Sequence, residues 1–507
     1  MQYTIGIDIG TSSTKAVAFS RTGQILAEAN GSYPPVVTSP GYHELDPDLL
    51  VAAVTACLRE VLRKMAGQTG PSAVVFSAAM HSLIAVDKNG RPLTRAITWA
   101  DTRSRDIAVR IKPTEAGSRI YSHTGTPIHS MSPLCKIIWL REHEPDIFRA
   151  AHKFIGIKEY IWFCFFGKFV IDYSLASATG LFDIVAYGWF GESLSLAGIS
   201  PERLSDLRPV EYIETAPALS PLADTGLTSG VPFVLGGSDG CLANLGTGAV
   251  LAGDASLTIG TSGALRMVTD KPSRDPAQRV FNYILTNGVY VCGGGVNNGG
   301  NILQWFVDHF IKDNHLETID LASALSGAAR VKPGSDGLIF LPYLLGERAP
   351  IWNEDARGVF FGIGTGHTRF HFLRAVMEGI SFSLCQVGLA LEETLGPIRQ
   401  LYASGGFIRS AEWLQMMADI FNKRVCVTHD ADASAIGAAM LGFYAIRQVR
   451  RLEDLAALVS PQEVYEPDPA RHRIYQESYQ RFASLYLALK GEFSLLAGNA
   501  PGTSGEV

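Results

Sequence analysis

The sequence lacks the features of secreted, membrane-spanning and nucleic-acid-binding proteins. Its seven cysteines are scattered and no two form a Cys-x-x-Cys pair, so we expect a reduced, cytoplasmic setting. A charged residue, Asp8, already stands inside the first expected strand, so we expect no signal peptide. The net charge of −6 gives no support to nucleic acid or an anionic membrane surface as a partner.

Long uninterrupted hydrophobic runs are absent as well. The most apolar segment, residues 154–171, contains Lys158, Glu159 and Lys168, which makes it too interrupted to span a bilayer, and we expect a buried core element there. The Walker A loop, Gly-x-Gly-x-x-Gly and His-Glu-x-x-His are also missing. With 507 residues, 47 % of them apolar, the chain has room for two or more domains with sizeable cores.

The first twenty residues predict a tight β-hairpin. Two β-branched, apolar runs flank a turn of Gly, Thr and Ser, in which Gly10 allows a ligand to approach the backbone. The N–H groups around Thr11 and Ser12 can cradle an anion, and Asp8 can hold a hydrated Mg²⁺. The alternative is an ordinary hairpin whose Asp and Thr side chains satisfy turn hydrogen bonds.

The following segments predict a parallel or mixed sheet covered by helices on both faces. We expect a third strand at 25–29, a helix that begins at Asp46-Pro47 and ends near Gly67, and a buried strand at 73–77. Polar clusters at 80–82 and 99–103 follow strands, where ligands of open α/β sheets bind. Taken singly, these clusters also fit a hydrogen-bonded core histidine and a local ion pair between an aspartate and an arginine.

The second half repeats features of the first. A glycine-rich stretch, 231–263, marks a domain junction, and its end, Thr258 to Gly263, echoes the first hairpin turn. Further on, a strand at 401–404 runs into Gly405-Gly406, with Ser410 as the expected N-cap of the next helix, a pattern suited to phosphate or ribose. The small residues of 433–439 fit close helix packing, or alternatively the wall of an adenine site.

Residues 236–240 support two different chemistries. Gly-Gly-Ser-Asp-Gly fits the Gly-x-Ser-x-Gly pattern of a serine hydrolase, with Ser238 as nucleophile and a later histidine (309, 315, 367, 371 or 429) as base. That hypothesis leaves the three phosphate-like turns unexplained. Phosphoryl transfer to an alcohol instead needs a carboxylate that takes the hydroxyl proton, and Asp239 at the junction supplies one.

The chain resembles the FGGY carbohydrate kinases of the sugar kinase, actin and heat-shock-70 ATPase superfamily. Both family signatures are present, one from Met131 to His143 and one from Gly358 to Glu378. Within the family, segments 80–83, 99–101, 124–129, 176–183 and 236–246 look most similar to gluconokinases, and xylulokinases share much of the pattern. An actin- or chaperone-type nucleotide switch on the same fold remains a non-enzymatic alternative.

The resemblance implies an α/β fold of two actin-like (ribonuclease H-like) domains facing each other across a cleft. We expect an N-terminal sugar-binding domain over 1–245, a C-terminal nucleotide-binding domain over 246–490 and a disordered tail over 491–507. The implied reaction is ATP-dependent phosphorylation of a sugar or sugar acid with Mg²⁺. Neither nucleic acid nor membrane is expected as a partner, and a homodimer is left open.

The resemblance also assigns the site residues. Asp239 is the general base, and Asp8 handles Mg²⁺. The sugar-side residues are His81, Trp99 and Asp101, and Arg103 and Lys158 are candidates for a substrate carboxylate. The phosphate and nucleotide contacts are Thr11, Ser12, Lys15, Gly260, Thr261, Gly300, Gln304, Gly405, Gly406 and Ser410. The family often has Asn where this chain has Ser410.

Overall fold

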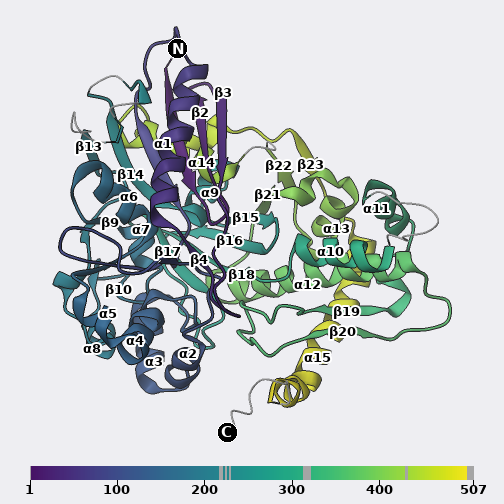
Figure 1. The fold of residues 1–507 in the computed structure, drawn as a ribbon. Helices are drawn as coiled ribbons and strands as arrows, with labels where there is room; N and C mark the ends of the chain where they lie inside the picture. Colours follow the sequence, from purple (N-terminus) through teal and green to yellow (C-terminus); the bar gives the residue numbers. More distant parts are fainter. Residues whose placement is uncertain are drawn as a thin grey trace. The chain divides into compact units, whose positions relative to one another are not determined.

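A computed structural model describes residues 2–215, 221–222, 225–227, 230–311, 321–428 and 432–498 (Figure 1). Two compact units make up the chain. The first contains residues 1–252, 268–292 and 431–460, and the second contains 253–267, 293–430 and 461–507. Segments 268–292 and 431–460 come after residue 245, the predicted end of the first domain, but they pack in the first unit. The first unit is therefore not one continuous stretch of chain.

The first unit contains a mixed sheet with strand order β13-β14-β5-β1-β2-β3. Strands β14, β5 and β1 are parallel, whereas β1, β2 and β3 form an antiparallel meander. The elements of this unit are β1 (Tyr3–Ile9), β2 (Ser13–Ser20), β3 (Ile25–Ser32), β4 (Glu44–Leu45), α1 (Pro47–Lys64), β5 (Val74–Ala78), β6 (Ile84–Val86), β7 (Ala96–Ile97), α2 (Arg105–Ile111), α3 (Glu115–Thr124), α4 (Pro133–His143), α5 (Pro145–Ala150), β8 (Lys153–Ile155), α6 (Ile157–Phe166), β9 (Val170–Asp172), α7 (Tyr173–Ser177), β10 (Phe182–Asp183), β11 (Gly188–Trp189), α8 (Gly191–Ala197), β12 (Asp206–Arg208), β13 (Ile213–Thr215), β14 (Pro232–Ser238), α9 (Asp239–Thr247), β17 (Phe281–Thr286) and α14 (Ala433–Ala445).

Helices cover both faces of this sheet, as predicted. On one face, the backbone of Gly31 in β3 lies against Ala53 and Cys57 of α1. On the other face, a side chain at Gly6 in β1 would meet the Ala435 carbonyl of α14 at 1.9 Å, so only glycine permits this close approach. The small residues of α14 therefore serve helix packing. The helix expected at Asp46-Pro47 is α1, capped by the Asp46 carboxylate.

The apolar segment 154–171 lies in the core of the first unit. It forms β8, α6 and β9, and the side chain of Trp162 in α6 is fully buried against Phe76 of β5. The prediction of a buried core element is confirmed.

The second unit contains the predicted second hairpin. Strand β15 pairs antiparallel with β16 and parallel with β21, which continues to β22 and β23. The elements of this unit are β15 (Asp254–Ile259), α10 (Gly300–Phe306), α11 (Leu321–Ala329), β19 (Ile339–Pro342), β20 (Gly358–Phe361), α12 (Arg369–Leu395), β21 (Gln400–Ser404), α13 (Ala411–Phe421), β22 (Val425–Val427), β23 (Glu463–Tyr465) and α15 (Pro469–Gly498). Strands β16 (Gly263–Thr269) and β18 (Val289–Val296) run from one unit into the other.

Two helices of the second unit bear on sequence predictions. Helix α12 is long and apolar enough to cross a membrane by composition, but 83 % of its most apolar window is buried inside the structure, which marks it as a core helix. The disordered tail predicted over 491–507 is wrong for 491–498, because these residues extend α15 and bury Phe493. The remainder of the predicted tail, 499–507, lies outside the described residues.

Candidate active site

Asp8, the predicted Mg²⁺ ligand, and Asp239, the predicted general base, lie at the same edge of the first sheet. Asp8 stands next to last in β1 and is paired across the sheet with Ser77 of β5, which in turn pairs with Gly237 of β14. Asp239 comes two residues later, as the first residue of α9. The strand order β14-β5-β1 thus places the carboxyl ends of these three parallel strands side by side, where α/β proteins bind ligands.

Asp8 is a buried acid among other acids. Ser77 Oγ donates to Asp8 Oδ1 at 2.6 Å. Burial raises the pKa of Asp8 well above its ordinary value, and the charges of Asp432 and Asp239 raise it further, while Ser77 and Lys15 oppose the shift. A carboxylate held in this state gains from any cation that reaches it.

Asp432, which the sequence analysis did not select, caps α14 and holds Lys15. Its Oδ1 accepts from Ala435 N at 3.0 Å, and its Oδ2 accepts from Lys15 Nζ at 2.6 Å. The pKa of Lys15 is raised: burial opposes the rise, but the Asp432 charge and hydrogen bond prevail. An aspartate immediately before a helix of small residues was a visible N-cap signal, but its ion pair with Lys15 depends on tertiary packing.

The first hairpin turn is held by a tyrosine. Gly10 N donates to Ser13 O at 3.0 Å, and the Tyr33 hydroxyl donates to Gly10 O at 2.6 Å. Thr11 is half-buried and Ser12 is exposed, so the turn carries its hydroxyl groups at the surface of the unit. The predicted hairpin is confirmed, with Ile9 opposite Thr14 as its last pair.

The hydrolase hypothesis fails at Ser238. Its side chain is fully buried, receives a hydrogen bond from Ser174 Oγ at 3.0 Å, and caps α9 by accepting from Cys241 N at 3.4 Å. Its backbone is ordinary extended chain (φ −75°, ψ 150°), unlike the strained turn of a nucleophile elbow. Two of its proposed bases, His315 and His429, lie outside the described residues.

The histidine predicted for the sugar side occupies a strained turn. His81 has a φ of 65° in the left-handed region, and its ring is held at both nitrogens. Nδ1 lies 2.8 Å from Ala178 O and Nε2 lies 3.2 Å from the Tyr283 hydroxyl. Because a carbonyl only accepts, Nδ1 carries a hydrogen and donates to Ala178 O, while Nε2 contacts the Tyr283 hydroxyl.

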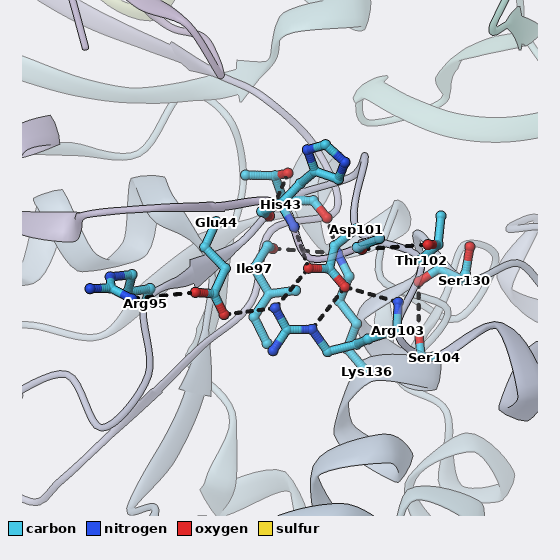
Figure 2. Close-up of polar contacts among 12 residues, drawn as sticks. His43, Glu44, Arg95, Ile97, Asp101, Thr102, Arg103, Ser104, Ser130 and Lys136 are labelled. Carbon is cyan, nitrogen blue, oxygen red and sulfur yellow. Dashed lines mark hydrogen bonds and ion pairs between the residues drawn. The ribbon is translucent and has the colours of Figure 1, made fainter. Parts of the chain in front are cut away.

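The loop after β7 carries Trp99, which is half-buried, and Asp101, which is fully buried. Asp101 accepts hydrogen bonds from His43 N at 2.7 Å and from the Arg103 backbone and guanidinium at 2.7–3.0 Å (Figure 2). Arg103 also donates to Glu44 Oε1 at 2.7 Å and stacks on the Tyr42 ring at 4.0 Å. Asp101 and Arg103 therefore form a local ion pair, the simpler of the two readings of this cluster.

Neither cation considered for a substrate carboxylate has its charge facing solvent. The Arg103 side chain is 7 % exposed and paired with two carboxylates, as described above. The Lys158 side chain is 1 % exposed, and its Nζ lies 2.7 Å from Asp172 Oδ2 and 3.1 Å from Gly237 O. Both charges are used within the fold.

In the second unit, four of the predicted nucleotide contacts come together: Gly260, Thr261, Gly300 and Gly405. The turn between β15 and β16 meets the start of α10, where Gly300 N donates to Gly260 O at 2.7 Å and Asn301 N donates to Thr261 O at 3.2 Å. Gly405 follows β21 directly and lies beside this turn: a side chain on Gly405 would meet Ile259 O at 2.5 Å. Gly406 begins the short 3₁₀ turn that leads to α13.

The two polar side chains predicted to contact nucleotide are engaged locally. Gln304 Nε2 donates to both carboxylate oxygens of Asp308 at 2.8 Å. Ser410 is the predicted N-cap of α13, and its Oγ accepts from Trp413 N at 3.3 Å and donates to Glu412 at 3.3 Å. The predicted cap is confirmed, and the nucleotide contacts of Gln304 and Ser410 stay predictions.

The surroundings of Asp8 suit a cation bound by a single protein carboxylate, and not a metal ion enclosed by several protein ligands. Across the described ranges, no group of three or more His, Cys, Asp or Glu side chains is arranged to hold a metal ion. Mg²⁺ needs no such group, since it binds one or two carboxylates together with water and substrate phosphates. The buried, charge-crowded carboxylate of Asp8 is the donor that such an ion would neutralise.

Models of one protein family match both halves of the chain. The model of the FGGY family of carbohydrate kinases, N-terminal domain, matches residues 3–246, and that of the C-terminal domain matches residues 255–446. A gluconokinase from Bacillus licheniformis is 42 % identical over 504 residues, 98 % of each chain, and a xylulose kinase from Bacillus subtilis is 30 % identical over 97 % of this chain and 98 % of that one.

A solved structure supports the fold. The crystal structure of a gluconate kinase from Lactobacillus acidophilus matches with a TM-score of 0.93 at 32 % identity, over 98 % of this chain and 99 % of that chain. The predicted two-domain α/β fold and the family resemblance are both confirmed. With family models over both halves and full-length relatives, this chain belongs to the FGGY family of carbohydrate kinases.

Proposed function

We propose that the protein phosphorylates a sugar acid, D-gluconate, at its terminal hydroxyl to give 6-phosphogluconate, with ATP as the phosphoryl donor. The observation that carries the proposal is the carboxyl edge of β14, β5 and β1, with Asp239 and buried Asp8, in a chain 42 % identical to a gluconokinase. Identity to a xylulose kinase is lower, at 30 %, and xylulose phosphorylation is the second candidate.

In the proposed reaction Asp239 is the general base. The substrate oxygen forms a bond to the γ-phosphorus, the bond from that phosphorus to the β–γ bridging oxygen breaks, and ADP leaves. The hydroxyl proton passes to the Asp239 carboxylate. Its place at the first residue of α9, where Oδ1 accepts from Gly240 N at 2.7 Å, keeps the carboxylate at the positive end of the helix dipole.

The phosphates are proposed to contact the backbone turn at Thr11 and Ser12 and the ammonium of Lys15. Asp8 would hold Mg²⁺, which when bound neutralises phosphate charge. The remaining nucleotide contacts are proposed at Gly260, Thr261, Gly300, Gln304, Gly405, Gly406 and Ser410. No atom stands within 4 Å of the position where a side chain at Gly260 or Gly406 would begin, so a nucleotide could approach the backbone closely there.

The sugar is proposed to meet His81 and Trp99. Asp101 contributes through the loop it holds, since its oxygens already accept four hydrogen bonds. We assign no residue to the gluconate carboxylate, because Arg103 and Lys158 are paired within the fold. We also propose a cytoplasmic location, in keeping with seven cysteines that all remain free thiols.

An ADP-release assay with Mg²⁺-ATP and a panel of sugars tests the proposal. We expect kcat/KM for D-gluconate to exceed that for D-xylulose, glycerol and glucose by at least ~10²-fold, about 2.7 kcal/mol. A site that provides a charged donor for the gluconate carboxylate would leave that donor desolvated and unpaired when a neutral sugar binds, and this is the physical basis of the expected discrimination. Preference for xylulose would overturn the gluconate assignment and favour the second candidate.

The role of Asp239 is tested with a matched pair of variants. Asp239→Asn is expected to lower kcat at least ~10²-fold and to leave ATP affinity nearly unchanged. Ser238→Ala, at the neighbouring position, removes a helix cap and the hydrogen bond from Ser174 but no proposed catalytic group, and is expected to stay largely active. Near-normal turnover by Asp239→Asn would remove this residue from the role of base.

A further inference from the structure

Lys136 is a fully buried lysine that donates to backbone carbonyls. It comes from α4, is 0 % exposed, and lies at the centre of the polar cluster in Figure 2. Its Nζ donates to His81 O at 2.5 Å, to Thr98 O at 2.7 Å and, at the long distance of 3.4 Å, to Ile97 O. An ammonium has three hydrogens, so these contacts use its whole donor capacity.

The carbonyls belong to two separate loops that carry the sugar-side residues. One is the turn at His81, whose left-handed backbone (φ 65°) is unfavourable for a residue with a side chain. The other is the end of β7, where Thr98 immediately precedes Trp99 and Asp101. Lys136 thus joins the strained turn to the Trp99 loop through a single atom.

The charge of Lys136 is not paired in the usual way. The pKa of Lys136 is lowered to about 7: burial lowers it most, the Asp101 charge opposes the shift, and the Arg103 charge adds to it. The carboxylate of Asp101 is instead occupied by Arg103 and His43 N. Burial of an ammonium that donates only to carbonyls carries a desolvation cost, whereas a leucine or methionine would fill the same space without that cost.

We propose that Lys136 is a positioning residue for the phosphoryl acceptor: its ammonium holds the His81 turn and the Trp99 loop in one arrangement, so that both meet the sugar together. The proposal rests on the sugar-side role proposed above for His81 and Trp99. Lys136 touches no substrate itself. Leu83 and Ile97 also join the two loops through a pair of backbone hydrogen bonds, at 2.9 and 3.0 Å. Loss of the ammonium should therefore leave this bridge in place but allow the His81 turn and the Trp99 loop to shift beyond it, which weakens sugar binding. The nucleotide contacts lie on other segments, so nucleotide affinity should not change.

The test compares Lys136→Met with Lys153→Met in the full-length protein. Lys153 is a matched control, since its Nζ also donates to two backbone carbonyls, Glu202 O at 2.9 Å and Leu204 O at 2.6 Å, but in β8 and away from both loops. Measured are kcat and KM for the sugar that the wild type uses best, the Kd of Mg²⁺-ADP by calorimetry, and Tm.

Lys136→Met is expected to raise the sugar KM at least about tenfold and to change the ADP Kd less than twofold, whereas Lys153→Met is expected to leave both unchanged. Equal losses of sugar and ADP affinity, or an unchanged sugar KM, would overturn the proposal. Lys136→Gln keeps an N–H donor and should recover part of the loss. Failure of both Lys136 variants to fold would also overturn it, since the lysine would then serve the fold alone.

The sugar preference of the wild type tests the proposed function, whereas the ratio of variant to wild-type KM tests the role of Lys136. If the wild type prefers a neutral sugar, the gluconate assignment fails, but the ratio between variant and wild type with that sugar still tests Lys136. If gluconate is preferred and the ratio stays near one, only the positioning role fails.

Discussion

The surroundings of the buried acid Asp8 disfavour its charged form. Asp8 is crowded by the charges of Asp432 and Asp239, and its pKa is raised well above the ordinary value. Its folded form therefore holds a proton to higher pH than the unfolded chain does. The free energy of unfolding contributed by Asp8 is intact below its ordinary pKa and is lost as pH rises through the raised folded pKa.

Asp8→Asn should remove this loss of stability at higher pH, because an amide has no charge to bury and its oxygen can still accept a hydrogen bond from Ser77. We predict that Asp8→Asn raises Tm in metal-free buffer by about 2 °C or more at pH 8, with a smaller gain at pH 5. At the same time kcat should fall at least ~10²-fold, since the proposed metal ligand is gone. Calorimetric scans at the two pH values and the ADP-release assay measure both effects.

Asp172→Asn is the control of opposite sign. This carboxylate is equally buried but pairs with the buried Lys158, so its loss leaves an unpaired charge and should lower Tm. A Tm gain for Asp8→Asn that is the same at both pH values would contradict the electrostatic explanation.

At this scale the sequence predicts residues whose chemistry is local. Asp8, Asp239 and Ser410 each sit at the end of a strand or the start of a helix, and short-range patterns identify such positions. Asp432 has a local N-cap signal, but its ion pair with Lys15 joins residues far apart along the chain. The contacts of Lys136 and Tyr283 likewise join residues at least 38 positions apart, so short-range patterns do not reveal them. Buried lysines in particular look like surface residues to any pattern based on hydrophobic period.

At the scale of elements, α14 is the helix most dependent on glycine. A side chain at Gly437 would meet the Leu242 carbonyl of α9 at 1.8 Å, and neither backbone can retreat, because α14 also lies against Gly6 of β1. We predict that Gly437→Ala destabilises the protein by at least about 3 kcal/mol, at or beyond the upper end of ordinary overpacking. Chemical denaturation followed by circular dichroism measures the change.

Gly491→Ala gives the matched comparison. Gly491 lies within α15, and nothing stands within 4 Å of the position where its side chain would begin. Alanine there should stabilise the helix by about 0.5–1 kcal/mol, since it removes the entropic cost of glycine. Equal effects of the two substitutions would show that helix propensity, and not the close approach of α14 to α9, decides the outcome.

Elements with strong local signals were predicted well. The Asp46 cap of α1, the Ser410 cap of α13 and the second Gly-Thr-Ser hairpin all match. At the C-terminal end of the chain local signals did less: the Gly- and Ser-rich C-terminal residues suggested disorder from 491, but α15 continues to Gly498. Its burial of Phe493 outweighs the weak helix propensity of its neighbours.

The whole molecule divides differently from its sequence. The first unit gathers its core from three separate stretches of chain, and α14 and β17 contribute side chains such as Phe443 and Tyr283 to the cluster that contains Val17 and Leu242. A glycine-rich junction is a local signal, whereas a return of the chain to an earlier sheet leaves no mark in composition. A boundary at 245 therefore divides the sequence, but it does not divide the two packed units.

This division predicts the behaviour of a fragment. Residues 1–245 alone lack α14, which covers one face of β1 and β5, and lack Tyr283, which holds His81. Without α14, the face around Val17, Val75 and Val234 is exposed to water, and the fragment loses a large part of its hydrophobic stabilisation.

We expect the fragment to show no cooperative thermal transition and to bind a hydrophobic dye such as ANS. We expect co-expression with residues 246–507, which carry both missing segments, to recover folded protein. A cooperative transition of the isolated fragment within a few degrees of the full chain would show instead that 1–245 is an autonomous domain and that α14 and β17 merely decorate it.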